Sequence, residues 1–326
     1  MSGGGRGGRD VPPEAAAAPS TPPAGNGSPG RPAPAAQRPG LVVVKLGGTT
    51  IEDDGDDRRA PPSRGGREGG GTGIEHPADP GRRSLLAQVA ALAAQRPVVV
   101  VHGGGKRLSA WLDRLGVPTR FEDGLRVTDE PSLEVTAAVL RGAVNVELVA
   151  ALRELGCDAV GISGVDGGTL TGERLPGKGR VVNPARVRPE LVRALLAAGM
   201  VPVVAPLALD PDGAVCNANA DDAAAVLARG LSADRLLLLT DVDGIRNASG
   251  RRMPRIDAGE AERLIAAGVI DGGMVPKVRA ALRALEGGGA PASIIDGGRP
   301  EVLARALAGT GAGTFIGPAP GRLRCR

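Results

Sequence analysis

Short, near-continuous apolar runs most constrain what this chain can fold into. They lie at residues 41–46, 98–101, 159–162, 201–205, 235–240, 292–295 and 314–316. Such runs are too short for helices and lack the alternation of a half-exposed strand, so they predict strands buried on both faces. Helical patterns separate them, at 84–94, 106–115, 131–155, 189–198, 219–229, 258–267, 274–285 and 301–308. This alternation predicts an α/β fold with a mostly parallel central sheet sandwiched by helices.

Glycine and proline are unevenly distributed along the chain. The 326 residues include 52 Gly and 28 Pro, which are concentrated in residues 1–40 and 53–83. Neither stretch can bury enough apolar surface to offset the entropy of ordering it. We therefore expect a disordered N-terminal extension at 1–40 and a domain at 41–316 that carries a low-complexity insertion at 53–83. A basic tail follows at 317–326.

The positive charge belongs to the two ends of the chain. Residues 1–40 hold four Arg against two acidic residues, and the tail holds three Arg, so a net charge of +4 leaves −1 for residues 41–316. The aromatic residues are one Trp and two Phe, with no Tyr. A domain without a basic excess or a set of stacking rings is not expected to bind nucleic acid.

Hydrophobic and cysteine patterns bear on location. The sequence contains no uninterrupted apolar run of about 18 residues, and the Ala-rich start is broken by proline instead of forming the apolar core of a signal peptide. The three cysteines are odd in number and far apart, which does not suit a disulfide framework. We expect a cytoplasmic protein that does not cross or bind a membrane.

Two glycine-rich turns follow predicted strands. Ligands of a parallel α/β sheet bind beyond the carboxyl ends of its strands. Lys45 lies at such an end, before Gly47 and Gly48, and the His-Gly-Gly-Gly segment 102–105 joins another strand to a helix. Bare N–H groups and a helix N-terminus hold oxyanions well. Neither turn has the spacing of a Walker A loop or a dinucleotide-binding fingerprint.

Three charged residues suggest phosphoryl transfer. Asp221 follows two asparagines just before a helix, and Lys277 follows a Gly pair at another helix start. A lysine there opposes the helix dipole, so an anion is expected nearby. Together with Lys45, these residues suit a reaction that proceeds by positioning and electrostatic stabilisation, without a covalent nucleophile.

Eight motifs in one order carry a resemblance over residues 41–316, apart from the insertion. They occupy residues 45–48, 102–105, 124–129 (Gly-Leu-Arg-Val-Thr-Asp), 163–167, 217–221 (Asn-Ala-Asn-Ala-Asp), 239–244, 273–277 and 295–297. On these residues the chain resembles the amino acid kinase family, and within it the members that act on N-acetyl-L-glutamate in arginine biosynthesis. The resemblance implies ATP-dependent phosphorylation of the γ-carboxylate of that substrate, giving N-acetyl-L-glutamyl 5-phosphate.

The resemblance also implies a role for each matching residue. Lys45 and Lys277 would stabilise the phosphoryl group in transfer, and Asp221 would hold both lysines. The implied substrate-binding residues are Gly104, Gly105, Arg126 and Asn217. The implied ATP-binding residues are Lys45, Gly47, Gly48, Asp241 and Lys277. No side chain is assigned to a metal, because Mg²⁺ would be held mainly by the nucleotide phosphates.

Assembly and lobes follow from the same resemblance. Residues up to about 205 would form the acceptor-binding lobe and residues from about 206 the ATP-binding lobe. Family members inhibited by arginine carry an N-terminal helix that links dimers into hexamers. Because residues 1–40 are rich in Pro and Gly, they do not suit such a helix. We predict an arginine-insensitive homodimer.

Two alternatives stay open at this stage. The hairpin at 168–182 is shorter and more basic than is usual in the family, which leaves room for a kinase of carrier-protein-bound α-aminoadipate in lysine biosynthesis. The motif at 124–129 favours the acetylglutamate reaction instead. The other alternative is a non-catalytic nucleotide-binding member, which the presence of Lys45, Asp221 and Lys277 disfavours. His102 is expected to pack or to cap its turn instead of acting as a base.

Overall fold

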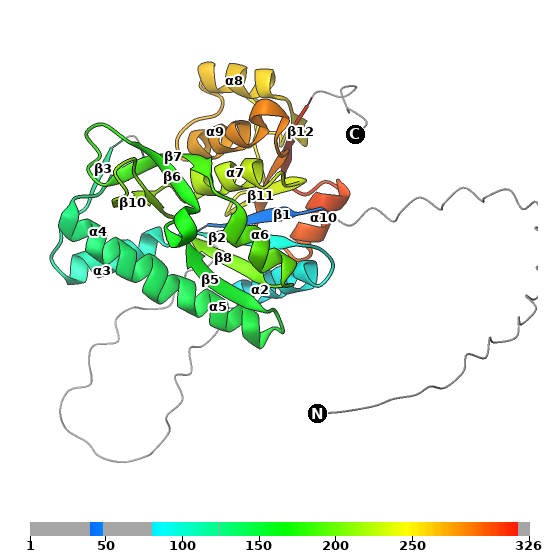
Figure 1. Ribbon diagram of the computed structural model, residues 1–326. Helices are drawn as coiled ribbons and strands as arrows, with labels where there is room; N and C mark the ends of the chain where they lie inside the picture. The colour runs from blue at the N-terminus through cyan, green and yellow to red at the C-terminus, as the bar shows by residue number, and fades with distance from the viewer. Residues whose placement is uncertain (1–39, 48–79, 123, 319–326) are drawn as a thin grey trace, which may run out of the picture. The chain divides into compact units, whose positions relative to one another are not determined.

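A sheet of eight strands organises the computed structural model, which describes residues 40–47, 80–122 and 124–318 (Figure 1). The N-terminal extension up to residue 39, the insertion up to residue 79, the tail from residue 319 and Gly48 lie outside the described residues. The predictions made for them therefore stay predictions. So does the division into lobes near residue 205, because strands from both halves pair side by side in one sheet.

The sheet is mostly parallel, as predicted. Its order is β12 (Arg255–Ile256), β14 (Thr314–Ile316), β13 (Ala292–Asp296), β11 (Arg235–Thr240), β1 (Val42–Leu46), β2 (Val98–His102), β8 (Val201–Ala205) and β5 (Ala159–Ser163). The six strands from β13 to β5 run parallel to one another, and only the pairing of β13 with β14 is antiparallel. Since β1 and β2 lie in the middle, their carboxyl ends meet at the centre of one edge of the sheet.

Helices cover both faces of this sheet, which gives the three-layer arrangement. On one face Val43 and Leu238 pack with helices α6 (Glu190–Ala197), α7 (Ala220–Gly230), α8 (Ala258–Ala266) and α9 (Met274–Leu285). On the other face Val44 and Leu237 pack with helices α2 (Pro80–Ala93), α3 (Gly105–Arg114), α5 (Asn145–Glu154) and α10 (Val302–Ala308). Both faces are dry, which explains why the strand sequences are apolar without alternation.

Helix α2 begins earlier than predicted. The sequence pattern placed its start at Ser84, with residues 80–83 in the insertion, whereas the helix begins at Pro80. Proline is tolerated in the first turn of a helix because its missing N–H is not needed there. The helix therefore begins five residues before its first buried leucine, Leu85.

The predicted helix at 131–155 contains a π-helical segment that the sequence did not indicate. It is built from α4 (Glu130–Ala137), a π-helical segment η1 (Ala138–Val144) and α5. By length and composition alone, the run Glu130–Glu154 is apolar enough to cross a membrane. Its buried Leu148 and Leu152 belong to the core beneath the sheet, and α5 contacts β5 and α2. A core helix of a globular domain accounts for this composition.

Further strands lie over the carboxyl edge, and of these only the hairpin at 168–182 was expected from the sequence. Strands β6 (Leu170–Arg174), β7 (Val181–Val187), β9 (Leu207–Leu209) and β10 (Val215–Ala218) close into a small barrel, and β3 (Arg120–Glu122) pairs with β4 (Leu125–Val127) in a ribbon. Single turns of 3-10 helix, η2 (Asp166–Gly168) and η3 (Glu286–Gly288), complete the described elements. These strands mix polar and apolar residues, so no apolar run marks them.

Candidate active site

A carboxylate held between two ammonium groups lies at the carboxyl edge of the sheet. Lys45 Nζ lies 2.7 Å from Asp221 Oδ1, and Lys277 Nζ lies 3.1 Å from Asp221 Oδ2. Lys45 and Asp221 are each 5% exposed. The structure therefore brings together the three residues that the sequence analysis singled out as catalytic, although they are far apart in the chain.

Local structure explains how the three residues meet. Lys45 is the penultimate residue of the central strand β1. Asp221 lies in the first turn of α7, where the Asn219 side chain caps the helix by accepting from the Asp221 and Asp222 N–H groups at 2.8 and 3.1 Å. Lys277 lies in the first turn of α9, which packs beside α7. Helices that start over the same strand ends present their first turns to one point.

The cluster carries more positive than negative charge. Burial alone would raise the pKa of Asp221, but the attraction of Lys45 and Lys277 outweighs it and holds that pKa below its usual range. The pKa of Lys45 is lowered, chiefly by burial and further by Lys277, against the attraction of Asp221. One carboxylate shared by two cations leaves a net charge of +1 in a dry setting, which favours an oxyanion beside them.

The triglycine turn lies beside this cluster, at the end of the strand that pairs with β1. Gly104 is the N-cap of α3, and no side chain caps this helix or places an acid in its first turn. The Gly104 and Gly105 N–H groups donate no hydrogen bond within the described residues. A Cβ at Gly104 would lie 2.6 Å from Leu140 Cδ2, whereas one at Gly105 would meet open space. The turn therefore offers bare N–H groups and a positive helix end to an anion.

Arg126 reaches the same turn from strand β4. Its guanidinium donates to Ser109 Oγ at 2.7 Å, Thr119 Oγ1 at 3.2 Å and the Gly105 carbonyl at 3.3 Å. The side chain lies over the Phe121 ring, 4.6 Å from its centroid. Burial lowers the pKa of Arg126, and among the described residues no carboxylate pairs with it. This buried cation suits a ligand carboxylate.

The groups that hold Arg126 could not be predicted from the sequence, apart from Phe121. Ser109 and Thr119 have no motif, and their hydroxyls become relevant only when β4 returns to α3. Phe121 was within reach, because the Asp-Gly pair at 123–124 is a strong hairpin signal. That hairpin pairs Phe121 directly with Arg126 across the ribbon.

The remaining predicted residues lie around the same edge. Asn217 of β10 donates from Nδ2 to Thr128 Oγ1 at 3.3 Å, on the side of the Arg126 strand. Asp241 directly follows β11, and its Oδ1 accepts from Thr240 Oγ1 at 3.0 Å. Gly47 follows β1 and is buried. Asn217 therefore lies near the strand that carries Arg126, and Asp241 lies at the carboxyl end of β11.

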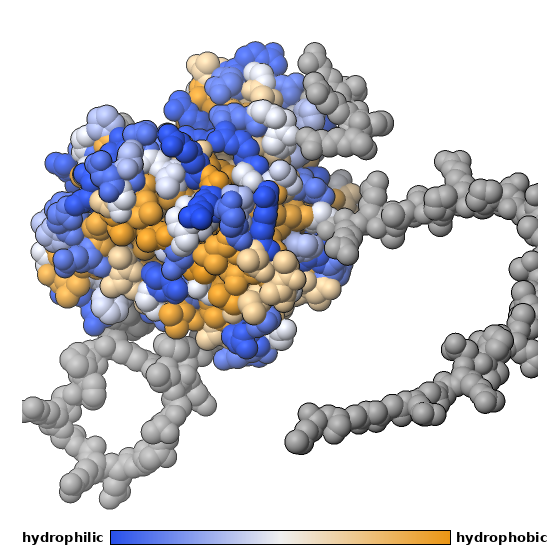
Figure 2. All heavy atoms as spheres, viewed as in Figure 1, coloured by the Kyte–Doolittle hydropathy of each residue, from blue (hydrophilic) through white to orange (hydrophobic). Residues whose placement is uncertain are grey.

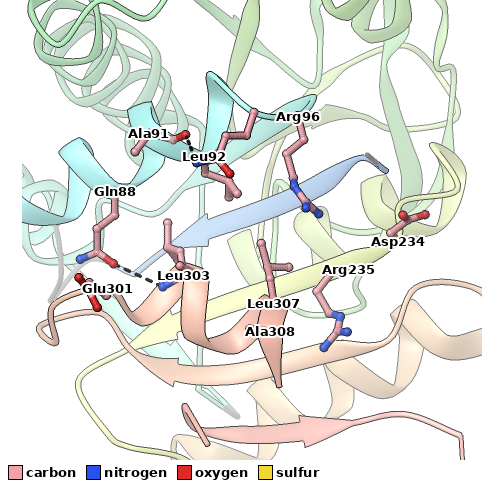
Figure 3. A pocket seen from close by; sticks show the side chains of 12 residues that line it. Gln88, Ala91, Leu92, Arg96, Asp234, Arg235, Glu301, Leu303, Leu307 and Ala308 are labelled. Atoms are coloured by element: carbon pink, nitrogen blue, oxygen red, sulfur yellow. Dashed lines mark hydrogen bonds between the residues drawn. The ribbon is translucent and has the colours of Figure 1, made fainter. Parts of the chain in front are cut away.

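A separate cavity of about 540 Å³ lies at the opposite edge of the sheet (Figure 3). Arg235 is the first residue of β11, and Arg96 precedes β2, so the cavity lies at the amino ends of the two strands that flank β1. Lys45 lies near the opposite, carboxyl end of β1. Helices α2 and α10 supply its apolar lining, including Leu92 and Leu307. None of the predicted site residues lines it, so it is distinct from the candidate active site.

The chain belongs to the amino acid kinase family, whose model matches residues 40–296. Relatives include the acetylglutamate kinase of Rubrobacter xylanophilus, 52% identical over 219 residues, which cover 67% of this chain and 85% of the relative. Another is the acetylglutamate kinase of Gluconacetobacter diazotrophicus, 42% identical over 232 residues, covering 67% of this chain and 74% of the relative. The resemblance inferred from the eight motifs is thereby confirmed.

Solved structures share the fold. The N-acetylglutamate synthase from Neisseria gonorrhoeae complexed with coenzyme A and N-acetyl-glutamate is 24% identical, with a TM-score of 0.68 over 85% of this chain and 59% of that one. Carbamate kinase from Giardia lamblia bound to AMP-PNP is 18% identical, with a TM-score of 0.59 over 85% of this chain and 98% of that one. At these identities the likeness concerns the fold alone.

Proposed function

We propose that this protein is an acetylglutamate kinase, which transfers the γ-phosphoryl group of ATP to the γ-carboxylate of N-acetyl-L-glutamate in arginine biosynthesis. A carboxylate oxygen of the acceptor bonds to the γ-phosphorus, and the bond from that phosphorus to the bridging oxygen of ADP breaks. The products are ADP and an acyl phosphate. The acetylglutamate kinases among its relatives support the substrate and the reaction.

The Lys45–Asp221–Lys277 cluster carries this proposal. In phosphoryl transfer, negative charge spreads over the equatorial oxygens of the group in flight. Two ammonium groups held by one buried carboxylate at 2.7 and 3.1 Å are pre-organised to stabilise that charge. Asp221 acts as their positioning residue and leaves them a net positive charge for the phosphoryl oxygens.

The acceptor and nucleotide would bind on opposite sides of the cluster. Arg126 would take the α-carboxylate of the acceptor, with Asn217 beside it and the Gly104 and Gly105 N–H groups on its carboxylate oxygens. On the other side, Gly47, Gly48 and Asp241 would contact ATP. Gly48 lies outside the described residues, so its role rests on the motif alone.

The residues present suit Mg²⁺ that arrives with the nucleotide. In the described ranges, no three His, Cys, Asp or Glu side chains gather as they do around a resident metal ion. The only carboxylate of the cluster, Asp221, already holds two lysines. Mg²⁺ on the phosphate oxygens would neutralise part of their charge, while the chain's own lysines act on the transferred group.

Hydroxylamine trapping tests the proposal directly, because hydroxylamine converts an acyl phosphate into a hydroxamate, which forms a coloured complex with ferric ion. With ATP and Mg²⁺, acetylglutamate should yield hydroxamate, whereas glutamate and aspartate should not. Hydroxamate from another acid and none from acetylglutamate would reject the substrate but keep the reaction class. Absence of ADP and hydroxamate with every acid would reject the kinase function.

One contact weakens the lysine-biosynthesis alternative. The basic turn between β6 and β7 is folded onto the ribbon, with Lys178 Nζ 2.9 Å from Glu122 Oε2 and Arg180 paired with Glu130. These glutamates neutralise the basic side chains that an acidic carrier protein would need. Carrier-bound α-aminoadipate therefore belongs in the substrate panel as a substrate expected to fail.

Assembly and location complete the proposal. We propose a cytoplasmic homodimer that binds neither nucleic acid nor membrane. Strand β5 ends the sheet, and Figure 2 shows apolar residues gathered where β5, β8 and α5 lie. On α5, Val146 is 54% exposed. An open sheet edge beside apolar surface is commonly covered by a second copy. Light scattering should give twice the chain mass of 32.7 kDa.

A further inference from the structure

His102 occupies an unusual place for a titratable side chain. It is the last residue of β2, is 0% exposed and precedes the triglycine turn. Its Nδ1 lies 2.7 Å from the carbonyl oxygen of Gly103, the next residue. Its Nε2 lies 3.1 Å from Nδ2 of Asn145, the residue that follows the π-helical segment η1 in the chain. The proposed reaction gives this buried ring no chemical role.

The neighbours of Asn145 fix the direction of each hydrogen bond. Asn145 Nδ2 lies 2.9 Å from the Val203 carbonyl oxygen, while Oδ1 accepts from Arg141 at 3.2 Å. Exchanging the amide's nitrogen and oxygen would place Oδ1 against the Val203 carbonyl oxygen and the NH₂ group against the Arg141 guanidinium. Because Nδ2 can only donate, His102 Nε2 must accept. The ring proton therefore lies on Nδ1 and is donated to Gly103.

This bond fixes the plane of the peptide that follows. The Gly103 N–H donates to the Leu46 carbonyl of β1 at 3.0 Å, and the Gly103 carbonyl accepts from His102. In a planar trans peptide the C=O and the next N–H point in opposite directions. A carbonyl held by the buried ring therefore turns the Gly104 N–H away from the core. Glycine would otherwise leave this peptide free to rotate.

The π-helical segment contributes from a second direction. Its Leu140 and Val144 lie against Gly104 so closely that a Cβ there would be 2.6 and 3.3 Å from them. Asn145 follows Val144 directly, so the same stretch supplies both the apolar wall and the amide that orients His102. The segment therefore restrains Gly104 by direct contact and Gly103 through Asn145 and His102.

We propose that His102 and Asn145 are positioning residues: through the Gly103 carbonyl they aim the Gly104 and Gly105 N–H groups at the carboxylate oxygens of the acceptor. The inference rests on the proposed function for the identity of the acceptor. It goes beyond that function because the orientation of the N–H groups at the acceptor site is attributed to a neutral ring and an amide, neither of which contacts the substrate in the proposed arrangement.

Two substitutions at one position separate orientation from packing. In His102→Asn the amide nitrogen occupies the place of Nδ1 and still donates to Gly103, whereas in His102→Gln the amide group falls near Nε2. We expect His102→Gln to lower kcat/KM for acetylglutamate about tenfold to hundredfold by misaligning the N–H groups. The KM for ATP should hardly change. His102→Asn should retain most of the wild-type kcat/KM, although it leaves a larger void.

Equal losses in the two variants, or an unchanged kcat/KM in folded His102→Gln, would overturn the inference. Circular dichroism and urea unfolding establish that each variant is folded. A second readout does not depend on the substrate. The chain has two histidines, so ¹⁵N spectra of the rings can assign the tautomer. An Nδ1–H tautomer of His102 is expected, and an Nε2–H tautomer would contradict the inference. Failure of the proposed function would instead appear as missing hydroxamate from the wild type.

Discussion

Lys45 and Arg126 are both cations with less than a tenth of their surface exposed, at 5% and 8%, yet their surroundings differ. Lys45 has a carboxylate 2.7 Å away. Arg126 has two hydroxyls, one carbonyl and the face of Phe121. The phosphoryl side of the site thus carries a counter-charge of its own. The acceptor side carries only neutral acceptors.

The difference fits the two tasks. A buried charge without an opposite charge is costly unless it is hydrogen-bonded, and a cation–π contact offsets about 0.5–2 kcal/mol of that cost. Arg126 can remain without a counter-charge in the free protein because its ligand is expected to bring a permanent carboxylate. In the proposed reaction the lysines act on charge that develops only during the transfer, and the ion pairs with Asp221 would hold them in place before ATP binds.

The largest effect is expected where the counter-charge is removed. Asp221→Asn leaves two ammonium groups without an anion, so kcat should fall on the order of 100- to 1000-fold. The free energy of unfolding should fall by about 3 kcal/mol, measured by urea denaturation. Asp222→Asn is the matched control, because Asp222 pairs with Arg283 outside the cluster. A kcat within tenfold of wild type for Asp221→Asn would contradict the role given to this carboxylate.

On the acceptor side the charge can be kept while its geometry is changed. Arg126→Lys retains the cation but loses the planar fork, so the KM for acetylglutamate should rise about tenfold to hundredfold, at 1.5–3 kcal/mol for a charged hydrogen bond. The KM for ATP should stay the same. Arg120→Lys on the same ribbon, where the side chain is 68% exposed, should have no effect. An equal rise in both KM values would show that the two sides are not separable.

A third buried group, neutral instead of charged, predicts how stability depends on pH. Burial lowers the pKa of His102 from 6.5 to about 4, aided by Arg141 and opposed by the bond to Gly103. Between these values the unfolded chain binds a proton that the folded chain does not, so stability falls as pH falls. The free energy of unfolding should drop by about 3 kcal/mol between pH 7 and pH 4.

Urea denaturation at a series of pH values measures this loss. His102→Gln should lack the part of it between pH 6.5 and 4. The lowered pKa of Asp221 acts in the same direction but below pH 4, because that carboxylate stabilises the fold only while it is ionised. A flat wild-type profile between pH 6.5 and 4 would contradict the burial of an uncharged His102.

The smallest effect concerns the chain outside both sides of the site. Because residues 1–40 do not suit a helix that links dimers, millimolar L-arginine should leave the rate unchanged. Deleting residues 1–37 should also leave kcat and both KM values unchanged. Hydroxamate assays with and without arginine test the first expectation, and light scattering tests the dimer. Inhibition by millimolar arginine, or hexamers, would overturn this prediction.

The elements that could be predicted share one property. Strands β8 and β11 and helix α9 have the predicted bounds. A strand buried on both faces has consecutive apolar residues, and an amphipathic helix has apolar residues at a regular spacing, so both patterns can be recognised locally. Of the barrel strands, the hairpin of β6 and β7 was expected at 168–182, whereas β9 and β10 were missed. Strands β9 and β10 are only three and four residues long, and they are defined by pairing with other strands, such as β10 with both β7 and β9.

For the candidate site, the sequence was enough to predict which residues would carry the chemistry. Lys45 lies near the end of a strand, and Asp221 and Lys277 lie in the first turns of helices. Apolar runs and glycines in the sequence are enough to predict these positions. Tertiary structure alone decided how they are held: Asp221 between two lysines, Arg126 against Ser109 and Thr119, and His102 against Asn145, 43 residues away. Hydrogen bonds and ion pairs depend on partners from other elements, and no local pattern records where those elements return. Buried strands can be predicted from neighbouring residues in the sequence, whereas the orientation of a glycine N–H group depends on contacts that form only when the chain folds.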